Sequence, residues 1–160
     1  MDVRWRAFEL RPDPVPVSDP NSEYVQMAWI RSVQPLAAKL GVGMRMPNVR
    51  PRTRLAHEAA AWARHHRKFE EMHEAIFRAY FERSEDVGGI DVLANLASTI
   101  GLDGAALRTC LNDHTHLQEV LDEESLAREY GLSGVPAFVA GNRALIGVQT
   151  QKSLEQFLCL

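Results

Sequence analysis

Only two cysteines, Cys110 and Cys159, supply a thiol to this chain, and they do not form a Cys-x-x-Cys pair. A redox dithiol or a zinc site needs close spacing of that kind, and a disulfide framework needs a higher density of cysteines. Free cysteine is among the residue types most often buried in folded proteins. We therefore expect both residues to act as small apolar side chains, with Cys159 the more exposed because it lies beside the C-terminus.

The histidines contain one carboxylate–imidazole pair at helical spacing, Glu70 and His73. Di-iron helical bundles use this Glu-x-x-His spacing, but they also need a second motif and two further carboxylates on facing helices. Asp113 and His116 are the nearest match to a second motif, and they fall where a helix is expected to end. Because the ligand set is incomplete, we expect no metal ion and no cofactor.

Five arginines gather around residues 50–67, and their charge is the next candidate for binding. They are Arg50, Arg52, Arg54, Arg64 and Arg67. A basic group of this size is more often a solvated face than an anion site, although an acidic peptide or glutathione could use it. The pattern alone therefore predicts a solvated surface.

The end of the chain changes from helical to strand-like spacing after Gly134. Two short apolar runs, PAFVA and RALIG, are separated by Gly141 and Asn142, which tolerate positive φ and suit a two-residue hairpin turn. A helix over residues 150–158 follows, with Thr150 as its candidate N-cap. We expect a β-hairpin followed by a C-terminal helix.

The start of the chain predicts a strand, a connection and then helix. Residues 3–10, VRWRAFEL, have the alternation of a strand with one buried face. Prolines between residues 12 and 20 remove backbone donors and predict an extended surface connection. Helical spacing begins near Ser22 and stops at Gly41, and Pro35 must either kink this helix or begin a second one.

Helical spacing dominates residues 53–130. Apolar residues there recur every three or four positions, which predicts amphipathic helices that bury one face. The first stripes consist of Leu55, Ala59, Trp62 and His66, and of Phe69, Met72, Ile76, Phe77 and Tyr80. We expect these stripes to form a core.

Four segments along nearly the whole chain resemble the DsbA-like thiol oxidoreductases of the FrnE type. They are VRWRAFELRPD, AHEAAAWA, AIFRAYFE and AREYGLSGVPAFVAGNRALIGVQT. That family is related to 2-hydroxychromene-2-carboxylate isomerases and kappa-class glutathione transferases. The resemblance implies an α/β fold, an incomplete thioredoxin-like fold with an inserted all-helical subdomain. Residues 1–52 and 131–160 would form the thioredoxin-like core, and residues 53–130 would form the helical insertion.

The same resemblance implies that Gly134, Val135 and Pro136 bind substrate beside the family's active-site dithiol, with the Val135–Pro136 peptide bond in the cis form. Considered without the family, a trans proline that starts a strand is the commoner outcome. The backbone of Val135 could pair with an extended peptide or with the cysteinyl group of glutathione. Pro136 has no N–H group that could compete for this pairing.

The chain departs from the family pattern in its nucleophile. In the family, a first strand and a CxxC motif at the start of a helix precede the strand that residues 3–10 resemble. A thiolate is favoured at a helix N-terminus, whereas Cys110 is expected late in a helix and Cys159 at the end of one. We therefore expect no catalytic residue in this chain, with the first strand and the start of the active-site helix absent from the core.

Three explanations fit that departure. The chain could be a shortened version of a longer protein, it could complete its sheet by dimerisation or strand exchange, or it could be a form that binds without catalysing. The missing neighbour strand would expose backbone edges, which predicts self-association as a homodimer.

The function expected from these features is thiol–disulfide exchange on protein thiols or disulfides, by a chain that is inactive as it stands. One alternative is a glutathione-dependent isomerase or transferase of the same fold. The other is a non-catalytic peptide-binding or assembly module.

Composition excludes other classes of protein. The chain has 160 residues, 46% of them hydrophobic, and a formal net charge of −3, which is typical of a soluble globular domain without a basic surface for nucleic acid. Its first ten residues mix charged and apolar side chains, unlike a secretory signal or a membrane span. We therefore expect a cytoplasmic protein with no nucleic-acid or membrane partner.

Overall fold

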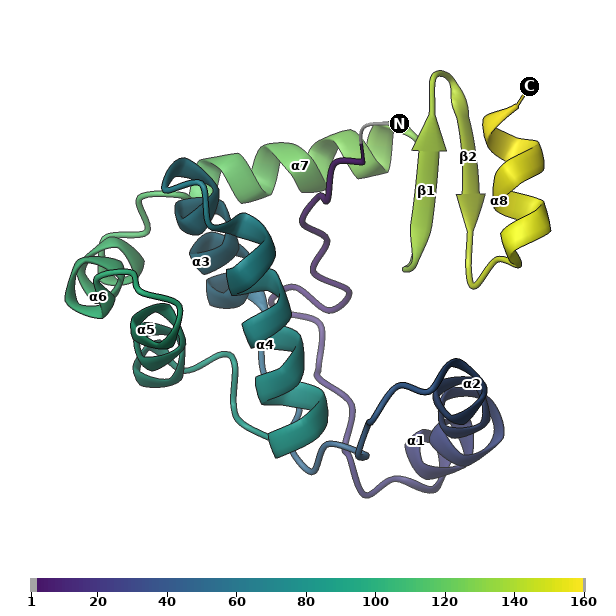
Figure 1. Cartoon of the computed structure of the whole chain (residues 1–160), viewed down its shortest axis with the longest axis horizontal. Coiled ribbons are helices and arrows are strands. Elements are labelled where there is room, and N and C mark those ends of the chain that lie inside the picture. The colour runs from purple at the N-terminus through teal and green to yellow at the C-terminus, as the bar shows by residue number, and fades with distance from the viewer. Residues whose placement is uncertain (1–2, 160) are drawn as a thin grey trace.

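The computed structural model describes residues 3–159, and its elements fall into a helical block, a helical pair and a hairpin with one helix (Figure 1). The helical block consists of α3 (Arg54–His65), α4 (Phe69–Arg83), α5 (Ile90–Thr99), α6 (Gly104–Asn112) and α7 (Leu117–Glu129). The helical pair consists of α1 (Glu23–Ala28), the π-helical turn η1 (Trp29–Val33) and α2 (Gln34–Leu40). The remaining elements are β1 (Ala137–Ala140), β2 (Arg143–Ile146) and α8 (Gln151–Leu158).

The helical block contains the main core of the protein. Its apolar stripes meet in one cluster whose largest fully buried side chains include Met72, Leu93, Leu107 and Leu111. The helices predicted over residues 53–130 are therefore confirmed. Phe77 and His66 are exceptions within the predicted stripes, because both side chains are exposed.

The predicted hairpin is confirmed in its turn and its register. β1 and β2 pair antiparallel with Ala140 opposite Arg143, and Gly141 in the turn adopts a φ of +61°. Thr150 caps α8 by accepting a hydrogen bond from the Ser153 amide at 3.1 Å. Arg143 joins β2 to α8, since its guanidinium donates to the carbonyl of Phe157 at 2.6 Å.

The strand predicted over residues 3–10 is wrong, because this segment is extended but forms no strand. Two of its backbone amides donate instead to carboxylates of α7: Ala7 to Glu123 at 2.6 Å and Glu9 to Glu124 at 3.2 Å. A strand is defined by a neighbouring strand, and in the described part of the chain the sheet contains only β1 and β2. Side-chain carboxylates thus take the place of a β-ladder here.

The proline-rich segment and the helices after it agree with their patterns. Residues 11–22 contain no helix or strand, and Arg52 holds this loop by donating to the carbonyls of Arg11 and Val15 at 2.6 and 2.7 Å. Pro35 lies in the first turn of α2, directly after η1, and the helical backbone continues from α1 through η1 into α2 without a break. Pro35 therefore does not begin a separate helix, and a π-helical turn precedes it. Gly41 ends α2 with a φ of +68°.

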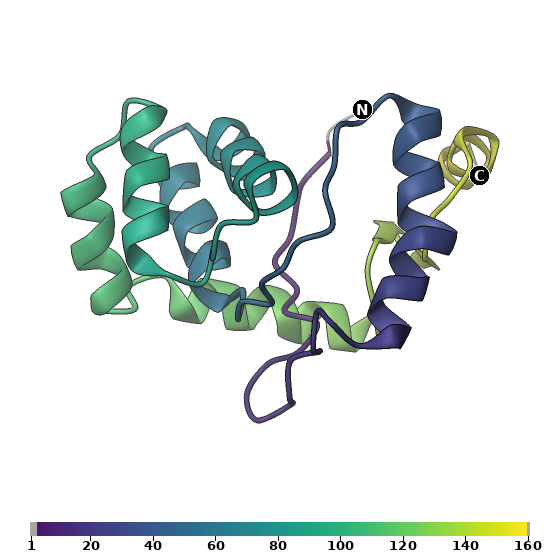
Figure 2. The same ribbon diagram turned by 90° about the horizontal axis from the view of Figure 1, so that it is seen from below.

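The helical pair lies away from the helical block and buries little of its apolar surface (Figure 2). Ala37 is its one buried residue among those described, whereas Tyr24, Ile30 and Leu40 are exposed. Over residues 3–159, none of the helices has the length and apolar character needed to cross a bilayer. The division of the chain at residues 53 and 130 stays a prediction.

Candidate substrate-binding loop

The three residues expected to bind substrate lie between α7 and β1, in a loop that is anchored at both ends. After α7, Gly131 adopts a φ of +68° and the Leu132 amide donates back to the Ala127 carbonyl at 3.0 Å, which ends the helix in a Schellman-like turn. At the other end the Gly147 amide donates to the Pro136 carbonyl at 2.7 Å. The loop is therefore fixed to two regular elements.

Within this loop, Val135 presents an unpaired backbone to solvent. The Val135–Pro136 peptide bond is cis, and Val135 is 53% exposed. Over residues 3–159, neither the amide nor the carbonyl of Val135 takes part in a hydrogen bond. An exposed and unpaired backbone edge of this kind is what a peptide needs in order to add as a short strand.

Neither cysteine lies in a position that favours a reactive thiolate. Cys110 is buried in α6, and burial raises the pKa of its thiol. Cys159 is exposed, as expected from its position, but it forms the C-cap of α8, where the helix dipole disfavours an anion. Both residues therefore suit the role of side chains without redox chemistry better than that of a nucleophile.

A network of buried charges lies beside residues 3–10. Arg54 contacts Glu9 at 2.8 Å and Glu124 at 3.4 Å, and both carboxylates are almost fully buried. Arg64 contacts Glu123 at 3.3 Å and donates to the carbonyl of Trp5 at 3.0 Å. This network ties the extended N-terminal segment to α3 and α7.

The arginine group predicted as a solvated face is for the most part engaged with the protein. Besides Arg54 and Arg64, Arg50 donates to the Tyr80 hydroxyl at 2.8 Å and Arg52 holds the proline-rich loop. The prediction was wrong because the acidic and carbonyl partners come from distant segments, which local spacing cannot reveal. Little of this positive charge remains available for an anionic ligand.

Aromatic rings form a row along α4, although the sequence predicted Phe69 and Phe77 as members of a buried stripe. Phe69, His73, Phe77 and Phe81 follow one another at intervals of four residues, with ring centroids 5.4, 4.6 and 5.9 Å apart. The ring of Trp5 lies 4.8 Å from that of His73. Burial lowers the pKa of His73, so its ring favours the neutral form. The row therefore presents a largely uncharged aromatic surface.

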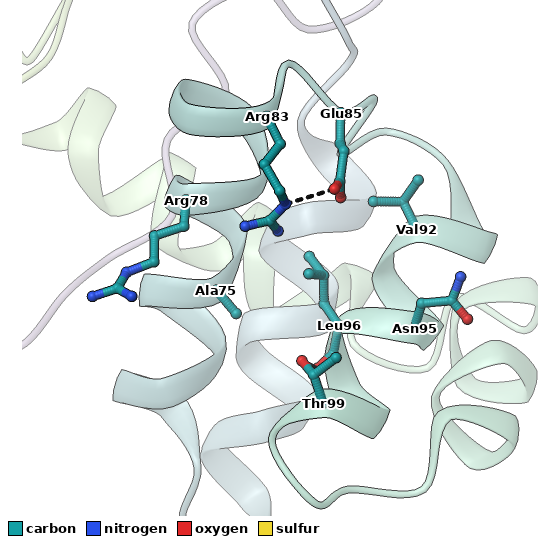
Figure 3. Close-up of a pocket in the computed structure, with 8 residues that line it drawn as sticks. All are labelled: Ala75, Arg78, Arg83, Glu85, Val92, Asn95, Leu96 and Thr99. Carbon is teal, nitrogen blue, oxygen red and sulfur yellow. Dashed lines mark hydrogen bonds and ion pairs between the residues drawn. The ribbon is translucent and has the colours of Figure 1, made fainter. Parts of the chain in front are cut away.

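A pocket of about 590 Å³ lies between α4 and α5 (Figure 3). Its charged lining includes Arg83 and Glu85, which are joined by a 2.6 Å ion pair, and Arg78, which pairs with Glu74. None of Gly134, Val135 and Pro136 lines this pocket. It is therefore a feature of the helical block separate from the candidate loop.

A helical block that precedes a proline-led hairpin and a final helix defines the class of α/β proteins with a thioredoxin-like fold and a helical insertion. The family model described as "DSBA-like thioredoxin domain" matches residues 1–159. The chain belongs to this DsbA-like family, and its fold is the DsbA-like thioredoxin fold.

Three known proteins are similar to this chain. The uncharacterized protein YwbO of Bacillus subtilis (strain 168) is 36% identical over 162 residues, which cover 98% of this chain and 80% of YwbO. A crystal structure from Streptomyces coelicolor, described as a probable DsbA oxidoreductase, superposes with a TM-score of 0.81 at 25% identity, covering 96% of this chain and 72% of that one. A 2-hydroxychromene-2-carboxylate isomerase superposes with a TM-score of 0.72 at 15% identity, covering 91% and 68%. This last likeness concerns the fold alone.

Proposed function

We propose that this chain serves thiol–disulfide exchange by binding extended protein segments that carry a thiol or disulfide, through Gly134, Val135 and Pro136. The exposed and unpaired backbone of Val135 carries this proposal. A peptide that pairs with Val135 is held by main-chain hydrogen bonds and is therefore accepted with little regard to its sequence. The family acts on thiols and disulfides, which occur in protein segments of many different sequences. A binding edge that accepts many sequences suits these substrates.

Binding and chemistry are separate in this proposal. A dithiol mechanism needs a thiolate stabilised at a helix N-terminus and a second thiol that resolves the mixed disulfide. Cys110 is buried and Cys159 caps the wrong end of its helix, so the two thiols of this chain meet neither need. We therefore expect the chain by itself to bind peptides and not to exchange disulfides.

The proposal also includes the FrnE type, a cytoplasmic location and a homodimer. Assignment to the FrnE type rests on the long helical insert and on the Phe-Arg-Ala-Tyr-Phe run of residues 77–81. A cytoplasmic location rests on the composition of the first ten residues, and a homodimer rests on the exposed apolar residues of the helical pair and the hairpin.

Titration of the ¹⁵N-labelled chain with a short peptide that contains one cysteine tests the binding step. We expect the amide resonance of Val135 to move downfield as the peptide pairs with it. The matched control is the same peptide with N-methylated amides beside its cysteine. It has no N–H group to donate to the Val135 carbonyl and it carries methyl groups on the pairing edge, so the Val135 amide should shift much less. Equal shifts with both peptides, or none at residues 133–136, would contradict the proposal. A shift with glutathione alone would favour the isomerase or transferase alternative.

Insulin reduction with dithiothreitol tests the separation of binding from chemistry. We expect the chain to leave the rate at that of dithiothreitol alone. Turnover that disappears in Cys110→Ser or Cys159→Ser would show that one of these cysteines is a nucleophile after all.

A further inference from the structure

Three side chains with metal-binding atoms meet where the end of α3 lies beside the start of α7. His65 is the last residue of α3, His116 is the N-cap of α7, and Glu119 lies in the first turn of α7. We propose that these three residues bind one divalent transition-metal ion, such as Zn²⁺. The site contains no residue of the candidate loop, so the proposal is independent of the proposed function.

The donor atoms are already close to the spacing that an ion requires. His65 Nε2 lies 3.0 Å and His116 Nδ1 lies 3.3 Å from the same Glu119 oxygen, Oε2. All three ligand atoms lie within 4.8 Å of one another. In a tetrahedral zinc site with bonds of about 2.0–2.1 Å, donor atoms lie about 3.3 Å apart. Two of the three separations therefore fit without rearrangement.

The remaining separation joins the two imidazole nitrogens, and it can shorten at little cost. The His65 side chain is more than half exposed, so rotation about its χ angles does not disturb the core. The rings of His65 and His116 are already neighbours, with centroids 4.8 Å apart and planes inclined at 33°. A rotation of the His65 side chain can therefore bring its Nε2 closer to His116 Nδ1.

The chemistry of the donors selects the kind of ion. Two imidazole nitrogens and one carboxylate oxygen suit Zn²⁺, Ni²⁺ or Cu²⁺, whereas Ca²⁺ and Mg²⁺ prefer sets made of oxygen alone. Three protein ligands leave at least one coordination position for water or an added ligand. The site is therefore of the open type.

A neighbouring arginine orients the carboxylate. Arg64 donates to Glu119 Oε1 at 2.9 Å, which leaves Oε2 directed at the two histidines. The Arg64 charge is shared with Glu123, 3.3 Å away, which reduces its repulsion of a bound cation. The Glu119 carboxylate is thus held in the orientation that an ion needs.

Local spacing could not indicate this site, because His65 and His116 belong to different helices and only the fold brings them together. The expectation of no metal ion was drawn from Glu70–His73 and Asp113–His116, whose spacing follows one helix. A bound ion would join α3 to α7 and would stabilise the folded chain by mass action.

Calorimetric titration with Zn²⁺ tests the proposal on tag-free, chelator-treated protein carrying Cys159→Ser, which removes the exposed thiol as a competing ligand. We expect saturation at one equivalent. Glu119→Gln and His65→Ala should each weaken binding by at least about tenfold. His73→Ala is the matched control and should bind as its parent does. Zn²⁺ should also raise the melting temperature of the parent and of His73→Ala, but not that of Glu119→Gln.

Three results would overturn the proposal. One is the absence of saturable binding at one equivalent. Another is unchanged affinity in both Glu119→Gln and His65→Ala. The third is loss of binding in His73→Ala, which would place the ion at the Glu70–His73 pair instead. Because the His65 side chain is exposed, His65→Ala should remain folded and keep the test valid if Glu119→Gln does not.

Discussion

The helical block and the rest of the molecule use apolar residues in opposite ways. In the block, Leu93, Leu107 and Leu111 are fully buried, because five helices lie against one another and each covers its neighbour's stripe. In the helical pair Tyr24 and Leu40 are exposed by 81% and 65%, and Val148, in the connection that follows the hairpin, is exposed by 67%. An amphipathic element becomes part of a core only when a second layer covers its apolar face.

Outside the block, polar contacts rather than apolar packing hold the backbone in position. The segment of residues 3–10 is held by the carboxylates of Glu123 and Glu124, and the proline-rich loop is held by Arg52. These contacts fix the position of a backbone but leave apolar side chains such as Trp5 and Leu10 exposed. The open part of the molecule is therefore suited to contacts with other chains, and the block is suited to stability.

Among the substitutions considered, Leu107→Ala should change the free energy of unfolding most. Loss of this fully buried side chain should lower the free energy of unfolding by about 2–5 kcal/mol, because it leaves a cavity in the block. Leu40→Ala, on the exposed helical pair, is the matched control and should change it by no more than about 0.5 kcal/mol. Urea unfolding in dilute solution measures both values. Equal losses would mean that the two regions are packed alike.

Arg54→Leu should come next. It leaves the buried carboxylates of Glu9 and Glu124 without their cation, and we expect a loss of about 1–3 kcal/mol. The control is Arg78→Leu, which breaks an exposed ion pair with Glu74 and should cost no more than about 0.5 kcal/mol. If the two variants lost the same stability, the buried network would have no special part in holding residues 3–10.

The next effect is smaller: His57 should make the free energy of unfolding depend on pH. Burial lowers the pKa of His57 below its ordinary value of 6.5, outweighing the nearby Glu9, which raises it. Because the unfolded chain binds the proton more readily, the stabilisation is complete above the unfolded pKa and is lost as the pH falls through the folded one. Urea unfolding from pH 7.5 down to pH 5 should therefore show a shallower decline for His57→Gln. A slope identical to that of the parent would rule out this contribution.

Self-association should be the weakest of these effects, and it remains a prediction. The exposed apolar residues of the helical pair and the hairpin favour a concentration-dependent homodimer. Light scattering coupled to gel filtration should detect it, and Val148→Glu should shift the population toward monomer. A monomer at all concentrations would show that the exposed residues are not sites of self-association.

Much of the fold follows from local patterns, and the exceptions depend on distant partners. The helices of the block follow from apolar spacing, and the hairpin turn follows from Gly141 and Asn142. The strand over residues 3–10 failed because a strand needs a neighbour, and no local pattern supplies one. Phe77 was misassigned because α4 presents aromatic rings on a face that no other helix covers completely.

The candidate sites also differ in how far local sequence patterns could predict them. The prediction that Gly134, Val135 and Pro136 bind substrate comes from a family resemblance, since a Gly-Val-Pro sequence alone fits an ordinary start of a strand. The grouping of His65, His116 and Glu119 could not be predicted from the sequence, because their proximity depends on how α3 packs against α7. Residue types limit the chemistry that is possible, whereas tertiary packing decides which residues can perform it.

Hydrogen exchange followed by mass spectrometry tests most directly whether a closed helical block carries an open binding loop. We expect amides in the core of α3, α5 and α6 to exchange over hours. Those of β1 and β2 should exchange within minutes, because an isolated two-stranded sheet is only marginally stable. The cysteine peptide should then slow exchange within residues 133–147 and leave the block unchanged. Hairpin amides as protected as those of α5 without peptide, or peptide protection confined to the block, would contradict this account.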